Sequence, residues 1–119
     1  MVVDDNRPAL RLWQSELRLS MMVEAPTAPV DAPVAVWITV FHDRPRSHFG
    51  TGRNQDRVRD SAPLLPASGR DLDKVARAVL DVGTGVWWSD DRRVIELRVT
   101  RVFAAQGCER TEVRGEEQG

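Results

Sequence analysis

Residues 71–104 read DLDKVARAVLDVGTGVWWSDDRRVIELRVTRVFA and decide the fold. Apolar residues first recur at the spacing of a helix, and after an acidic turn they recur at the spacing of a strand. Val75, Val79 and Val82 recur at helical spacing, which predicts a helix from about 73 to 82 that ends at the GTG of residues 83–85. From 93 to 104 the residues alternate instead, which predicts a strand with one face mostly in water. The apolar positions of that strand are Ile95, Leu97, Val99 and Phe103.

Upstream of this stretch the sequence predicts one more helix and one buried strand. Residues 6–22 carry an apolar stripe at helical spacing, with Asn6 as the cap and Leu10, Trp13, Leu17 and Met21 as the stripe. A connector with three prolines, EAPTAPVDAP, follows at 24–33. VAVWITVFH at 34–42 is apolar on both alternating faces, which is typical of a strand in the middle of a sheet.

The remaining segments are less regular. Residues 43–70 show no convincing period, and a loop this long in a small domain is usually functional or disordered. RTEVR at 110–114 predicts a short edge strand, and residues 115–119 predict a frayed tail. We therefore expect a single α+β domain over residues 1–119, with two helices on a small, mostly antiparallel or mixed sheet.

The composition bounds the function. The 119 residues contain a single cysteine, Cys108, so an internal disulfide and a cysteine-based zinc site are excluded. No apolar run is long enough to cross a membrane or to act as a signal peptide. We expect a cytoplasmic protein with no membrane partner.

The basic charge is concentrated in one segment. The net charge is −1, but residues 43–70 hold six arginines against three aspartates, a local charge of +3 that leaves −4 for the rest. All basic residues except Lys74 are arginine, which suits bidentate phosphate contacts, although a high-GC codon bias gives the same excess. The residues expected to contact nucleic acid are Arg44, Arg46, His48, Arg53, Arg57, Arg59 and Arg70.

Four carboxylates surround the helix at 73–82. Asp71 and Asp73 are one residue apart and point to the same side if the backbone is extended, while Asp90 and Asp91 lie in the turn before the next strand. If the fold brings the two pairs together, these hard oxygen ligands suit magnesium or manganese. The alternative is ordinary local chemistry, in which Asp71 or Asp73 caps the helix and the Asp90–Asp91 pair forms a turn.

The order of these motifs resembles a known family. RDLDKVARAVLD, a glycine-containing turn and WWSDDRRVIELRV closely resemble the RusA-type Holliday junction resolvases, whose pattern is Asp-x-Asp, a basic helix residue and aromatic-x-Asp-Asp-x-x-Val. RPRSHFGTGRN at 44–54 resembles the basic loop of the phage-borne branch of that family. The resemblance covers roughly residues 33–104, and the ordered combination is far more specific than any single motif.

The resemblance implies an activity and a site. It implies magnesium-dependent hydrolysis of DNA phosphodiesters at four-way junctions, by a homodimer that serves recombination and repair. Asp71, Asp73 and Asp91 fall on the family's catalytic, metal-binding aspartates, with Asp90 as the neighbouring acid.

Two departures from the family pattern bear on activity. Arg77 stands where the family has a catalytic lysine, and because arginine cannot release a proton it could only stabilise charge. Lys74 is the alternative source of an ammonium group. The family's N-terminal strand is not evident in the sequence. The competing hypothesis is therefore a catalytically impaired or inactive module that binds branched DNA. The pair Trp87 and Trp88 is expected in the core or in a dimer interface.

Overall fold

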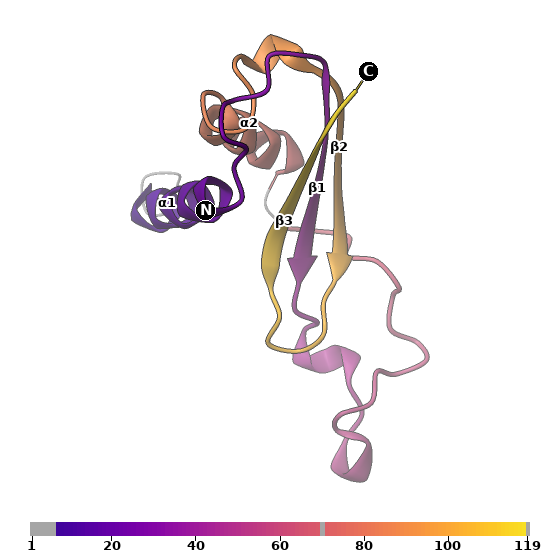
Figure 1. Ribbon diagram of the computed structural model, residues 1–119. Coiled ribbons are helices and arrows are strands. Elements are labelled where there is room, and N and C mark those ends of the chain that lie inside the picture. Colours follow the sequence, from indigo (N-terminus) through magenta and orange to yellow (C-terminus); the bar gives the residue numbers. More distant parts are fainter. Residues whose placement is uncertain (1–6, 70, 119) are drawn as a thin grey trace.

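The computed structural model describes residues 7–69 and 71–118, with side chains from residue 15 onward (Figure 1). Two helices, α1 (Arg7–Val23) and α2 (Leu72–Gly83), accompany three strands, β1 (Val34–His42), β2 (Val94–Phe103) and β3 (Arg110–Glu117). Short 3-10 turns lie at η2 (Arg46–His48), η3 (Gly52–Asn54) and η4 (Asp91–Arg93). The predicted α+β class with a mixed sheet is confirmed.

The sheet has the order β2-β1-β3, with β1 parallel to β2 and antiparallel to β3. Parallel neighbours need a long crossover connection, and α2 lies within the one that joins β1 to β2. The apolar sequence of β1 on both faces therefore matches its central position. Val34, Val36, Ile38 and Val40 are buried, and Trp37 and Phe41 on the other face are partly buried.

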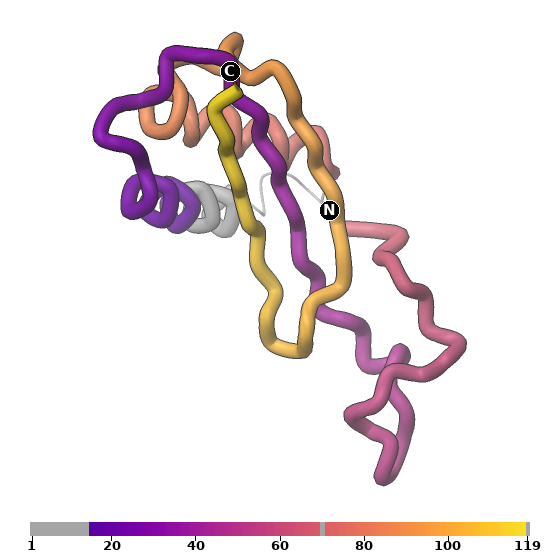
Figure 2. Tube along the Cα trace, turned by 45° about the vertical axis from the view of Figure 1, so that its right-hand side comes forward, coloured from indigo at the N-terminus to yellow at the C-terminus, as the bar shows by residue number. Residues whose placement is uncertain are grey.

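Both helices lie on the same face of the sheet (Figures 1 and 2). Val75, Val79 and Val82 of α2 are buried in one cluster with the core-facing residues of β1, as their spacing predicts. Leu17 and Met21 of α1 join this cluster, whereas the side chains of Leu10 and Trp13 and the cap Asn6 lie outside the described residues. In the described part of the chain no helix is long and apolar enough to cross a membrane.

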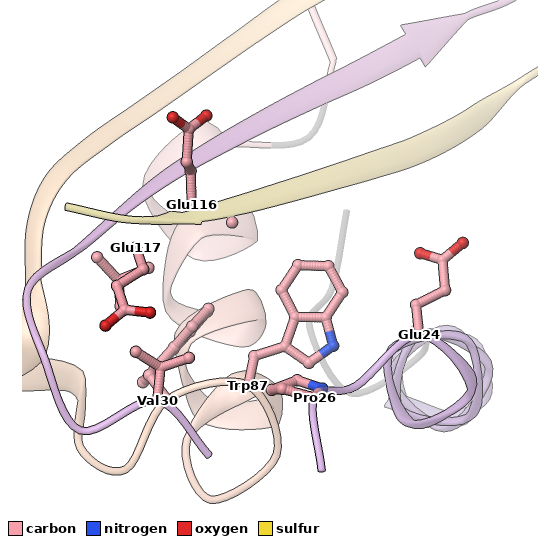
Figure 3. Close-up of a pocket in the computed structure, with 9 residues that line it drawn as sticks. Glu24, Pro26, Val30, Trp87, Glu116 and Glu117 are labelled. Carbon is pink, nitrogen blue, oxygen red and sulfur yellow. The ribbon is translucent and has the colours of Figure 1, made fainter. Parts of the chain in front are cut away.

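The two adjacent tryptophans contact the core of the chain to different extents. Trp88 is fully buried and its ring lies so close to Gly83 that a Cβ there would collide with it. The Trp88 Nε1 donates to Thr84 Oγ1 at 3.2 Å. The Trp87 Nε1 donates to the carbonyl oxygen of Met21 at 2.6 Å, and its indole lies between the connector and β3 (Figure 3). Trp88 therefore lies in the core, whereas Trp87 packs against the core and is partly exposed.

Two details of the sheet differ from the prediction. The frayed tail predicted at 115–119 is wrong for residues 115–118, because β3 continues to Glu117 and the Gln118 N–H donates to the Pro33 carbonyl at 2.7 Å, while Gly119 lies outside the described residues. The free edge of β1 supplies backbone partners for Gly115 and Glu117, and this pairing outweighs the polar composition. On the edge strand β2, Ile95 and Leu97 belong to the predicted apolar face but are exposed, because the helices do not cover this part of the strand.

Between β1 and α2 the chain leaves the sheet as an arm, residues 43–69, that projects beyond the carboxyl ends of β1 and β2 (Figure 1). The arm is folded rather than featureless. Phe49 is buried, an isolated bridge pairs it with Val58, and the Arg59 N–H donates to the His48 carbonyl at 2.8 Å. Backbone pairing of this kind leaves little periodicity in the sequence, which explains why the segment reads as a loop.

Candidate functional site

The Asp-x-Asp motif lies at the amino end of α2. Asp71 occupies the N-cap position, yet its side chain makes no capping hydrogen bond within the described residues. Asp73 lies in the first helical turn, so the two carboxylates do not share an extended segment as expected. A carboxylate near a helix N-terminus is favoured by the helix dipole. The local alternative would have the Asp71 side chain cap α2, but the Asp71 carboxylate makes no such hydrogen bond to any described residue.

Gly69 shapes the approach to this motif. Its φ of +153° favours glycine, and a Cβ there would collide with the Arg101 guanidinium and lie 2.8 Å from the His42 ring. The chain thus passes closely over the end of β1 two residues before Asp71. No pattern in the sequence distinguishes this glycine from an ordinary loop glycine.

The second acidic pair begins the 3-10 turn η4. Asp90 is its N-cap and accepts from the Arg92 backbone N–H at 2.9 Å and from Arg92 Nη2 at 3.2 Å. These hydrogen bonds, first from the backbone and then from the side chain of Arg92, lower the pKa of Asp90 to about 2. The Asp90 carboxylate thus accepts hydrogen bonds from its own turn, as the local alternative predicts. Asp91, the next residue, is directed to another partner.

Arg77 connects the two acidic pairs. Its Nη1 lies 3.8 Å from Asp91 Oδ2, while Lys74 Nζ lies 3.8 Å from Asp71 Oδ2. Asp73 lies one helical turn before Arg77 and could face it, but α2 packs against η4 and the Arg77 guanidinium lies beside Asp91. These pairs are exposed and contribute little to stability. We call Asp71, Asp73, Asp90 and Asp91 together the acidic end.

The donor set of the acidic end has the chemistry that a hard divalent cation requires. Within residues 7–69 and 71–118, however, no group of three or more His, Cys, Asp or Glu side chains is close enough to hold one ion. Asp91 and Asp71 instead have Arg77 and Lys74 as counter-ions. Binding of an ion by these carboxylates requires them to exchange the chain's own cations for it.

Asp31 is a neighbour of this site that the sequence did not indicate. It accepts from Ser89 Oγ at 2.8 Å and pairs with Arg93 Nη2 at 2.8 Å, so it contacts the residues on both sides of Asp90 and Asp91. The Ser89 hydrogen bond and the charge of Arg93 lower the pKa of Asp31. The cavity between them measures about 570 Å³ and is lined by Asp31, Ser89, Asp90, Arg92 and Arg93.

The basic residues of the arm divide into two sets. Arg44, His48 and Arg59 make contacts within the protein. Arg44 lies over the Phe103 ring at 4.2 Å, the His48 ring meets Phe103 edge-on at 5.4 Å, and Arg59 Nε donates to the Phe49 carbonyl at 2.5 Å. The second set is exposed and comprises Arg46, Arg53 and Arg57. Arg70 lies outside the described residues.

Comparisons with known proteins agree with the motif order. The family model described as endodeoxyribonuclease RusA matches residues 5–114, which include the arm, both helices and the whole acidic end. No curated protein and no solved structure matches the chain. The family match extends over far more than half of the sequence, and the chain therefore belongs to the RusA family of endodeoxyribonucleases.

Proposed function

We propose that this protein is a magnesium-dependent, structure-specific endonuclease that resolves four-way DNA junctions by paired phosphodiester hydrolysis. The observation that supports the proposal is the contact of Arg77 with Asp91, which joins α2 and its Asp71–Asp73 motif to the turn that carries the second acidic pair. Membership of the RusA family gives this arrangement its chemistry.

Asp71, Asp73 and Asp91 would hold magnesium or manganese, with Asp90 beside them. A bound ion would activate a water molecule and neutralise charge on the scissile phosphate. With Asp91 engaged in holding the ion, the Arg77 guanidinium would be available to stabilise the negative charge of the phosphate. Lys74 on the first turn of α2 adds a second positive group beside Asp71. Because an arginine retains its proton, Arg77 acts by charge alone.

Paired cleavage follows from symmetry. A four-way junction has two-fold symmetry, and a homodimer with two-fold symmetry presents two acidic ends to it. We therefore propose that the active form is a dimer and that it acts on cytoplasmic DNA during recombination and repair. The exposed arginines of the arm, Arg46, Arg53 and Arg57, would neutralise backbone phosphates.

A second function is favoured by one observation. Asp71 and Asp91 already have cationic partners from the chain, and no described three-residue cluster is preformed for a metal. A protein with this arrangement and with arginine at position 77 could bind branched DNA without cutting it. Metal dependence separates the two functions, because binding without cutting would be the same in chelator.

The test uses a synthetic four-way junction with labelled strands. The nuclease should produce nicked duplexes with magnesium and none in chelator, whereas the binding module should retard the junction equally in both and never nick it. Sedimentation in the same buffer measures whether the protein is a dimer. A 13.4 kDa monomer at micromolar concentration would contradict paired cleavage.

A further inference from the structure

The return limb of the arm, residues 61–69, exposes two adjacent leucines. Leu64 is 86% exposed and Leu65 is 63% exposed, and Pro63 and Pro66 flank them. A single exposed apolar side chain is ordinary on a protein surface. Two neighbouring leucines that are both this exposed form an apolar tip on the arm, which we call the leucine tip.

The leucine tip is anchored at its base. Arg44 Nη1 donates to the Pro63 carbonyl oxygen at 2.9 Å, and the same guanidinium lies over Phe103, the last residue of β2. The limb is thereby attached to the carboxyl end of β2. The two prolines also fix their own φ angles, so little backbone freedom remains to be lost when the tip makes a contact.

The surroundings of the tip are basic. Residues 43–69 hold five arginines against three aspartates, and Arg46, Arg53 and Arg57 are exposed. A partner that fits this surface must offer negative charge to the arginines and an apolar face to the leucines. DNA offers both, because phosphates line its exterior and its base faces become accessible where stacking is interrupted.

The kind of DNA follows from the cost of reaching a base face. Apolar side chains that wedge between stacked base pairs must first unstack them, and this cost is smallest where pairing or stacking is already broken. We propose that the leucine tip inserts at the branch point of a four-way junction and gives the protein its preference for branched over continuous DNA. This inference rests on the proposed function, since it takes junction DNA as the substrate.

The experiment replaces the tip with a polar one. The double variant Leu64→Ser with Leu65→Ser is titrated in chelator against a four-way junction and against a linear duplex of the same sequence. We expect junction affinity to fall about tenfold, while duplex affinity changes by less than about twofold because the arginines are intact. A 2-aminopurine placed at the branch point should brighten when the parent protein binds and stay dim with the variant.

Matched controls keep the test specific. Leu19→Ser with Val23→Ser on α1 removes two side chains that are 65% and 86% exposed and should keep the parent's preference. Leu64→Met with Leu65→Met retains an apolar tip and should keep it too. An unchanged ratio of junction to duplex affinity in the serine variant would overturn the inference. So would a change from dimer to monomer in sedimentation, which would assign the tip to a second copy.

Nicking by the parent protein, measured in the same preparations, separates this inference from the proposed function. A parent that prefers junctions without nicking them would remove the nuclease and keep the leucine tip. A parent that nicks junctions, with a serine variant that still prefers them, would remove only the tip. A parent that binds junctions and duplexes equally would also overturn the inference.

Discussion

The acidic end and the arm are attached to the same three strands in opposite ways. Asp71 and Asp73 of the acidic end lie at the start of α2, whose Val75 and Val79 are in the core, and Asp90 and Asp91 lie in the turn that follows the buried Trp88. The carboxylates therefore have a buried support. The arm has one buried residue of its own, Phe49, and otherwise depends on backbone bonds and on Arg44 and Arg59. The comparison indicates that the carboxylates can be altered without unfolding, whereas the arm can be unfolded without disturbing them.

The largest expected effect is on cleavage by the acidic end. If the proposed function holds, Asp73→Asn and Asp71→Asn should each lower the magnesium-dependent cleavage rate by roughly a thousandfold, about 4 kcal/mol in activation free energy, because each removes a charge from the proposed metal site. Junction binding should be kept, and the thermal midpoint should stay within about 2 °C, since both side chains are exposed and the Asp71 side chain makes no capping hydrogen bond among the residues described. Asp81→Asn, an exposed position on α2, is the control. Full activity in both variants would remove the acidic end as the site.

Next come two aromatic truncations that test the difference in support. Trp88→Ala should lower the free energy of unfolding by about 3–5 kcal/mol, because a fully buried ring leaves a cavity in the core. Phe49→Ala should lower global stability far less and instead remove hydrogen-exchange protection from the amides of Gly50 and Arg59. Equal loss of protection in α2 and in the arm would show that the two regions unfold as one unit.

A smaller effect separates the two sets of arm arginines. Arg46→Ala with Arg53→Ala should weaken junction binding and reduce the slope of log affinity against log salt by about 0.9 for each phosphate that is no longer neutralised, with the thermal midpoint unchanged. Arg44→Ala should instead loosen the arm, because Arg44 contacts Pro63 and Phe103. If Arg44→Ala changed only the salt slope, its contacts within the protein would be unimportant.

The smallest effect is a titration within the acidic end. Carboxyl resonances should show Asp90 titrating at about 2, and Arg92→Ala should raise this pKa only part of the way toward the ordinary 3.8, because the variant removes the guanidinium but keeps the backbone N–H, which is the larger cause. Because the folded pKa is the lower one, the stabilising interaction is present above about pH 4 and is lost as the pH falls toward 2. A pKa that does not rise at all in the Arg92→Ala variant would show that the guanidinium contributes nothing and that the backbone N–H of residue 92 carries the shift.

Periodicity predicted most of the fold. The valines of α2 and the two-sided apolar pattern of β1 report burial directly, and the structure agrees with both. The end of β3 was missed, because backbone pairing of Gly115–Glu117 with β1 does not depend on apolar side chains. The folded arm was missed for the same reason.

The sequence indicated which residues belong to the candidate site better than it indicated which of them contact one another. The motif order identified the four aspartates and Arg77, but the partner of Arg77 depends on how α2 packs against η4, which spacing along one helix cannot supply. Asp31 left no signal at all, because its link to Ser89 and Arg93 joins segments far apart in the sequence. The roles of the four aspartates in metal binding stay predictions.

The parallel pairing of β1 with β2 has a consequence for how the chain folds. Every contact in that pair spans both the arm and α2, so it forms only after a long segment has been closed, which favours slow folding. The entropic cost of closing a flexible loop rises by only about 0.6 kcal/mol for each doubling of its length. The arm within this crossover can therefore be lengthened or shortened at little thermodynamic cost to the pairing of these two strands.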